Sequence, residues 1–277
     1  MRSLPSQLLL VLLTVMFPGW LNAQKYIEKD SVTVVNPRVY VNAGLYYVGM
    51  TTSLRVDSDL GLGTDISLED DFKMPSQLSV FRTEAVARVK ERSQFVFLFT
   101  SMKRSRDVSI DEDIEFADTT FYVDADLSTF FNVNYLGFTW RYSVWNKPGW
   151  NAGFSVGLRA MNIKAGLEAT LNDQSYQRES SVWAPSLLVG IHGAGYLNSR
   201  LLARYSMEYF QLNIEGIKAN VLENSFSVEY FVLKNVGIGA GYGTSAYVVR
   251  EIPFNEDFDG KVKLVFGGFK TYLTARF

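Results

Sequence analysis

Residues 182–214, VWAPSLLVGIHGAGYLNSRLLARYSMEYFQLNI, contain two segments of alternating polarity with a short polar turn between them. In the second segment the odd-numbered positions from 201 to 209 are apolar or aromatic, and Arg204, Ser206 and Glu208 lie between them. A period of two is typical of a β-strand with one apolar and one polar face. Asn198 and Ser199 are turn formers. The stretch therefore predicts an antiparallel hairpin.

The same alternation continues along most of the chain. Turn signals divide it into ten predicted strands: 39–56, 78–89, 94–103, 121–145, 150–171, 182–197, 200–214, 225–233, 236–249 and 262–277. Short links alternate with links that are mostly longer and acidic. That alternation is the pattern of a transmembrane β-barrel, which has short periplasmic turns and long outer loops. A β-sandwich gives no reason for it, and a soluble barrel needs only short loops.

We therefore predict one all-β domain over residues 38–277, an antiparallel up-and-down transmembrane barrel. Ten strands is the preferred count. Eight or twelve remain alternatives, because residues 64–69 could form a hairpin of their own.

The apolar face of each strand is expected to meet lipid and the polar face the lumen, because hydrocarbon tolerates neither charges nor unpaired backbone. On this facing the lumen carries a charge cluster: Arg82, Glu84, Arg88, Arg141, Arg159, His192, Arg204, Glu208, Glu229, Lys270 and Arg276. Its excess of basic groups would suit an anion channel. We prefer an ion-paired, filled interior, because barrels near eight strands have room only for side chains.

Composition excludes several classes of function. The 277 residues include no cysteine and one histidine, so disulfides, thiol chemistry, cysteine zinc sites and multi-histidine metal centres are ruled out. The formal net charge of −2 gives no electrostatic case for nucleic-acid binding. No cofactor or metal is predicted.

The first 23 residues have the features of a secretory signal peptide. Arg2 precedes the apolar run 8–17, and Pro18-Gly19 stands before a cleavage position after Ala23. The run is shorter than the roughly 20 residues that a spanning helix needs, so we expect cleavage. Residues 24–37 would form a periplasmic lead-in. Export and a barrel together predict the bacterial outer membrane.

The chain ends Leu273-Thr274-Ala275-Arg276-Phe277, with Phe269 upstream. This end resembles the terminal strand of bacterial outer-membrane proteins, which typically ends in Phe. The resemblance implies that the barrel-assembly machinery reads Phe269, Leu273 and Phe277. Blocks at 63–72, 81–84 and 114–121 resemble a family of Gram-negative outer-membrane β-barrels to which no chemistry is assigned.

His192 is the one candidate for catalysis, as a general base on the lumen face. Ser186 shares that face but lies about 20 Å away at ~3.3 Å per residue, so the two cannot hydrogen-bond. Omptin-type proteases also have ten strands, but the Asp–His pair that they need high in the barrel is not apparent here. We therefore expect His192 to be a bonded lumen side chain and the protein not to be an enzyme.

Two further patterns have plain structural interpretations. Glycines at 237, 239, 241 and 243 remove side chains from one strand face, which we expect to accommodate bulky neighbours. The acidic loop residues match no calcium-loop spacing, and we expect solvated loops that reach lipopolysaccharide through divalent cations: Asp65, Glu69, Asp70, Asp71, Asp111, Glu112, Asp113, Glu115, Glu256, Asp257 and Asp259.

The sequence thus favours a non-enzymatic, integral outer-membrane barrel, structural or interacting through its acidic outer loops, with lipid and lipopolysaccharide as partners. We expect a monomer. A narrow channel for small anionic or amphipathic solutes is the alternative, and a hydrolase using His192 is the least favoured.

Overall fold

The computed structural model describes residues 37–57, 63–109, 114–116, 119–121, 126–171, 174–214, 217–255 and 258–277. The predicted signal peptide and almost all of the lead-in lie outside these residues. Within them, no helix has the length and hydropathy needed to cross a membrane.

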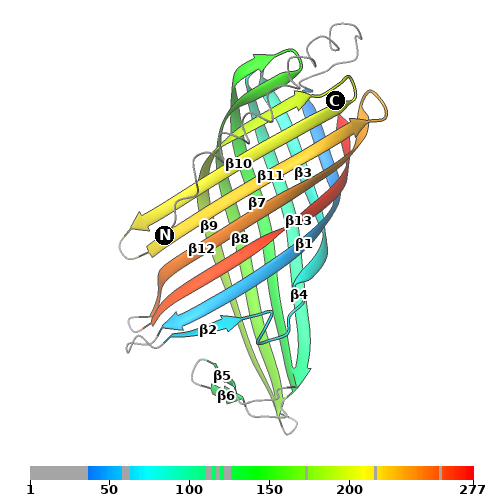
Figure 1. Cartoon of the computed structure of the whole chain (residues 1–277). Helices are drawn as coiled ribbons and strands as arrows, with labels where there is room; N and C mark the ends of the chain where they lie inside the picture. The colour runs from blue at the N-terminus through cyan, green and yellow to red at the C-terminus, as the bar shows by residue number, and fades with distance from the viewer. Residues whose placement is uncertain are drawn as a thin grey trace, which may run out of the picture.

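The described chain is built of β-strands (Figure 1). Their bounds are β1 Val39–Asp57, β2 Gly63–Ser67, β3 Gln77–Lys90, β4 Ser93–Ser109, β5 Ile114–Phe116, β6 Thr119–Phe121, β7 Asp126–Lys147, β8 Trp150–Leu171, β9 Gln174–Tyr196, β10 Leu201–Ile214, β11 Ile217–Phe231, β12 Val236–Asn255 and β13 Phe258–Arg276.

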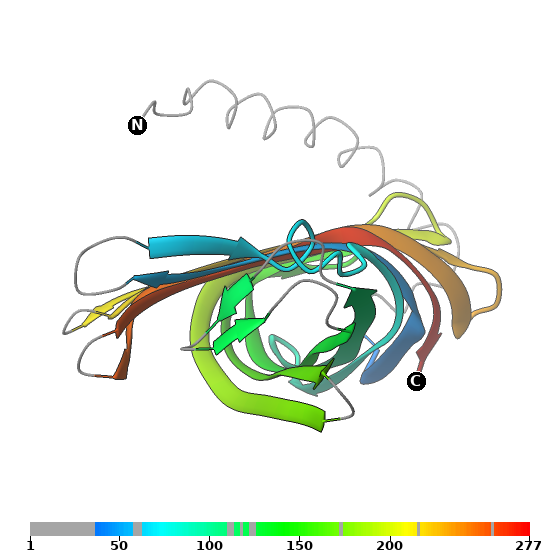
Figure 2. The same cartoon turned by 90° about the horizontal axis from the view of Figure 1, so that it is seen from below.

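Ten of these strands form a closed antiparallel barrel, which confirms the predicted fold class. Neighbours in the sheet follow the order β13-β12-β11-β10-β9-β8-β7-β4-β3-β1, and β1 pairs again with β13. This seam runs from Tyr40 opposite Arg276 to Asp57 opposite Asp259. Figure 2 looks at the barrel from the end where β5 and β6 lie. The residue 64–69 region supplies β2, which pairs only with the outer part of β1 and adds no strand to the ring.

Both ends of the barrel chain lie beside the short turns. The Val39 and Phe277 backbones hydrogen-bond each other, and the Arg276 amide donates to the carbonyl of Asn235 in the β11–β12 turn. Asn198 closes the β9–β10 turn by accepting two backbone N–H bonds, at 2.9 and 2.8 Å. Gly149 adopts a φ of 89° in the β7–β8 turn, a conformation that favours glycine. Short turns mark the periplasmic end in such barrels.

The exterior is apolar along the strands, as the predicted facing requires. Large hydrophobic side chains are exposed on every side of the ring, among them Leu45, Phe81, Phe97, Phe138, Phe154, Leu187, Tyr205, Phe226, Ile238 and Phe269. A closed barrel with this surface is stable in lipid rather than in water.

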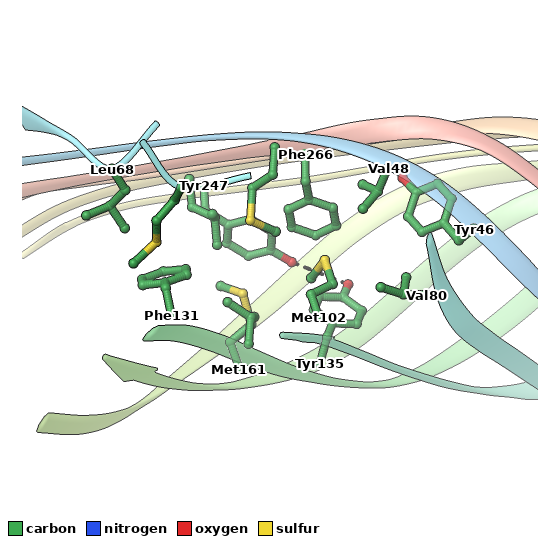
Figure 3. Packing of buried hydrophobic residues seen from close by; sticks show 14 of the residues in the cluster. Tyr46, Val48, Leu68, Val80, Met102, Phe131, Tyr135, Met161, Tyr247 and Phe266 are labelled. Carbon is green, nitrogen blue, oxygen red and sulfur yellow. Dashed lines mark hydrogen bonds between the residues drawn. The ribbon is translucent and has the colours of Figure 1, made fainter. Parts of the chain in front are cut away.

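The interior corrects one expectation. The lumen face is mostly polar in its periplasmic half, whereas in the outer half it carries a continuous hydrophobic cluster, shown in Figure 3. Side chains from opposite walls meet there: Tyr46, Val48, Met50, Val80, Met102, Phe131, Val133, Tyr135, Met161, Leu188, Val221, Tyr247, Leu264 and Phe266. Burial against the opposite wall stabilises these residues as a protein core does.

The chain between β2 and β3 completes this cluster. Within residues 68–76, which we call the plug segment, Leu68, Phe72 and Met74 are 6 %, 6 % and 5 % exposed and belong to the same cluster. The segment is therefore part of the core, although the acidic sequence around it predicted a solvated loop.

Candidate functional site

The barrel interior contains the whole predicted charge cluster. Side chains buried inside are Arg159, His192, Glu208, Glu229, Lys270 and Arg276. Those of intermediate exposure are Arg82, Glu84, Arg88, Arg141 and Arg204. Strand alternation alone positions them, because all occupy inward-facing positions of β3, β7 to β11 and β13.

The periplasmic layer of the cluster is ion-paired and stacked on aromatic rings. Arg204 Nε lies 2.9 Å from Glu229 Oε1, and the Tyr272 hydroxyl donates to the same oxygen at 3.1 Å. The Arg204 guanidinium also stacks 4.1 Å from the Tyr40 ring centre. Arg276 likewise lies 3.8 Å from the ring centre of Phe231 and donates to the Lys234 carbonyl at 2.7 Å. These contacts fix the arginines in place.

A second polar network lies directly on the periplasmic side of the hydrophobic cluster. Arg159 pairs with Glu208, and its Nε lies 3.1 Å from Glu223 Oε2. Glu223 also accepts hydrogen bonds from the hydroxyls of Tyr135 and Tyr247. Sequence reasoning missed Glu223, because residues 215–223 were interpreted as a loop and not as the start of β11. The inward alternation of Ser225, Ser227 and Glu229 extends to it and could have found it.

A third ion pair holds the plug segment in the barrel mouth. Glu69 pairs with Arg104 on β4, and its other oxygen accepts the Thr52 backbone N–H at 2.8 Å. Arg104 also donates to the Thr52 hydroxyl at 2.7 Å. The prediction that Glu69 is a solvated loop residue is therefore wrong: burial of its neighbours brings it to an arginine. Asp70 and Asp71 remain exposed and accept hydrogen bonds from Ser67.

The remaining acidic-loop predictions receive no structural account. Asp111, Glu112, Asp113, Glu256 and Asp257 lie outside the described residues, and only the backbone is described for Asp65, Glu115 and Asp259. In the part of the chain that is described, no group of three or more His, Asp or Glu is placed to hold a metal ion.

Two adjoining cavities of ≈ 50 Å³ each lie between the two inner networks. Both are lined by Arg82, Glu84, Arg141, Ser206, Ser225 and Lys270. We call this space the central chamber. The Lys270 ammonium donates to the Ser225 hydroxyl at 2.6 Å, and Arg82 lies 5.5 Å from the ring centre of Tyr46.

The glycine row of β12 makes room for three long side chains. A methyl group on Gly239 would meet the Tyr272 ring, and one on Gly241 would lie 2.8 Å from Lys270 Cε. Gly243 offers its carbonyl oxygen to the Tyr46 hydroxyl at 3.0 Å. The row therefore accommodates bulky neighbours and leaves no ligand groove.

His192 lies on the chamber wall, 3.4 Å from the Ser143 hydroxyl. Its Nδ1 is buried, and among the described residues no carboxylate lies within ion-pair distance of the ring. A histidine–serine pair needs a third group to orient the imidazole before it can act as a nucleophile and base. The arrangement therefore does not form a triad.

The C-terminal signature residues lie on the opposite side of the wall. Phe269, Leu273 and Phe277 are 67 %, 63 % and 72 % exposed and face outward from β13 and its end. Their recognition during assembly stays a prediction.

Neither a protein-family model nor a curated protein matches the sequence. Among solved structures, the fold is similar to the outer-membrane protease OmpT from Escherichia coli, with a TM-score of 0.59 and 9 % identity over 89 % of this chain and 100 % of that chain. The translocator domain of the autotransporter NalP from Neisseria meningitidis gives a TM-score of 0.42, with 10 % identity over 93 % of both chains. The toluene transporter TodX from P. putida gives 0.36, with 10 % identity over 90 % of this chain and 93 % of that one.

These similarities concern the fold. Together with the apolar exterior, the fold makes this protein an integral β-barrel of the bacterial outer membrane. Similarity of fold at 9 % identity carries no activity with it, so the activity must be argued from the interior and the loops.

Proposed function

We propose that the protein is a closed, non-enzymatic outer-membrane barrel that acts through its extracellular end. The observation that carries this proposal is the hydrophobic cluster filling the outer half of the lumen. A path for ions or polar solutes needs water or polar groups along its length, and a hydrophobic constriction closes it by excluding water. Here Leu68, Phe72 and Met74 occupy the mouth from the loop side.

The closure is supported by the polar networks that flank it. The pair of Glu69 and Arg104 ties the plug segment to β4 at the outer side of the cluster. Glu223 and its tyrosine partners lie at the periplasmic side of the cluster. Breaking a buried ion pair by removing one partner costs about 3–5 kcal/mol, so the pair of Glu69 and Arg104 holds the plug segment firmly.

The extracellular end is then the surface available to partners. The strands β7, β8 and β9 have 22, 22 and 23 residues. A transmembrane strand needs only about 9–11 residues, so these three project beyond the bilayer. Exposed Asp70 and Asp71 lie at the same end and would reach anionic lipopolysaccharide through divalent cations, which suits a surface-interacting or structural role.

A narrow channel for small anionic or amphipathic solutes is the second candidate. The cations of the central chamber favour it, but the plug segment and the rest of the hydrophobic cluster would have to move. A hydrolase is not proposed, because the pair of His192 and Ser143 has no orienting carboxylate among the described residues and lies behind the closed mouth.

Single-channel recording tests the closed state. The folded protein, purified from outer membranes, is inserted into planar bilayers under a salt gradient, with a general porin as the positive control. We expect no stable conductance steps while the sample retains heat-modifiable migration on gels. Stable steps with an anion-selective reversal potential would overturn the proposal in favour of the channel.

A further inference from the structure

We propose that the central chamber binds a small oxyanion of the inorganic phosphate type. Three cationic side chains reach it from three separate strands: Arg82 on β3, Arg141 on β7 and Lys270 on β13. Glu84 lines both cavities, and Glu208 and Glu223, which are paired with Arg159, line one of them. No comparison with known proteins assigns a ligand to it.

The two guanidinium groups have unused hydrogen-bonding capacity. Within the described chain, Arg82 and Arg141 form no ion pair within 4.0 Å and donate no hydrogen bond to another residue. The Nε of Arg141 is buried without a partner, and the contact of Arg82 is with the face of the Tyr46 ring. Each guanidinium carries five N–H donors in a planar fork that suits two oxygens of one anion.

Lys270 adds a third donor group, and a glycine on the neighbouring strand leaves room for its buried side chain. Its side chain is 9 % exposed and passes over Gly241, where any larger residue would meet its Cε. One N–H is directed to the Ser225 hydroxyl at 2.6 Å. An ammonium has three N–H donors, so two remain for the chamber.

The charge around the chamber is not balanced by protein groups. Glu208 and Glu223 are paired with Arg159, and Glu229 is paired with Arg204. Five cations therefore face four carboxylates, an excess of one positive charge, and Glu84 is the one lining carboxylate near Arg82, Arg141 and Lys270 that is not already paired. Burying unpaired charge is expensive, and water alone would not neutralise it. An oxyanion supplies both the charge and several acceptor oxygens.

The size and the walls of the chamber indicate which kind of anion can bind in it. One water needs about 10–15 Å³ of such volume, so each ≈ 50 Å³ cavity accommodates a few waters or one small ion. The strand wall excludes lipid headgroups, and the hydrophobic cluster closes the outer side. The ligand is therefore a soluble oxyanion and not a lipid headgroup.

Isothermal titration calorimetry of the folded full chain in detergent micelles tests this site. Sodium phosphate is titrated at constant ionic strength, with sodium chloride as the reference ion. We expect saturable binding of one phosphate. Arg141→Gln and Lys270→Met each lower the affinity at least tenfold, whereas Glu84→Gln raises it about tenfold because a competing carboxylate is lost. Arg200→Gln, at an exposed turn, is the matched control and leaves the affinity unchanged.

Two results would overturn the site. One is the absence of saturable phosphate heat in wild-type protein that migrates as folded. The other is a loss of affinity in Glu84→Gln as large as that in Arg141→Gln, which would mean that the substitutions disturb packing and not a binding site. Calorimetry measures binding without ion flow, so the two hypotheses can fail separately. A barrel that gives no conductance and binds no phosphate would overturn this inference alone. A barrel that conducts ions and binds phosphate would overturn the proposed function alone.

Discussion

Replacing Phe72 by alanine is expected to release the plug segment from the barrel mouth. The ring is 6 % exposed and packs in the outer hydrophobic cluster together with Leu68 and Met74. Truncating a buried phenylalanine costs about 3–5 kcal/mol. Since each 1.4 kcal/mol is tenfold in an equilibrium constant, the undocked population should rise by about two to three and a half powers of ten.

Hydrogen exchange measures this release at individual amides. The Leu68 N–H donates to the Thr52 carbonyl at 3.1 Å, and the Thr52 N–H donates to Glu69 Oε2 at 2.8 Å, so both bonds join the segment to β1. Both bonds break when the segment leaves the barrel, so both amides should exchange about 100- to 3000-fold faster in Phe72→Ala. Phe81→Ala is the matched control, because that ring is 56 % exposed on the lipid face of β3.

The two alternative outcomes are distinct. Unchanged exchange at Leu68 and Thr52 in a folded Phe72→Ala barrel would refute the view that hydrophobic burial holds the segment. Faster exchange throughout β7 and β13 would show that Phe72 supports the whole barrel and not one mobile piece.

Three further outcomes are expected. Glu223→Leu should lower the free energy of unfolding in urea by about 3–5 kcal/mol, because an arginine and two tyrosine hydroxyls lose their shared acceptor. Gly268→Ala should give almost no folded band on semi-native gels, since the added methyl would coincide with a β1 carbonyl oxygen at the seam, whereas Gly49→Ala, with 3.6 Å to its nearest neighbour, should fold normally. Phe277→Ala, which removes a side chain that is 72 % exposed and keeps the backbone hydrogen bonds to Val39, should slow membrane insertion in a pulse-chase experiment while the thermal midpoint of the folded barrel is retained.

The sequence predicted the ring of strands well because local signals determine it. A turn former such as Asn198 marks each periplasmic end, and polarity alternation defines which side of a strand meets lipid. The predicted positions of the outer strand ends were less accurate. There the alternation weakens, and β11 begins at Ile217, eight residues before the predicted start at residue 225.

The content of the lumen was harder to predict, for a physical reason. Val48 and Met50 point inward while Leu45 and Tyr47 point outward, so β1 is apolar on both faces. The alternation of polarity in this strand therefore does not show which face meets lipid. The partner that buries these inward residues comes from the plug segment and from strands far along the chain. Pairings such as Glu223 with Arg159, or Glu69 with Arg104, depend on barrel closure and have no local signature.

The seam between β1 and β13 has a consequence for biogenesis. The first and the last strand of the domain are neighbours, paired from Tyr40 opposite Arg276 to Asp57 opposite Asp259. A nascent polypeptide that lacks β13 has two unpaired strand edges, and hydrocarbon cannot satisfy their hydrogen bonds. No fragment that lacks β13 is thus a stable membrane species. The strands must stay unpaired through export until β13 is available to complete the cylinder.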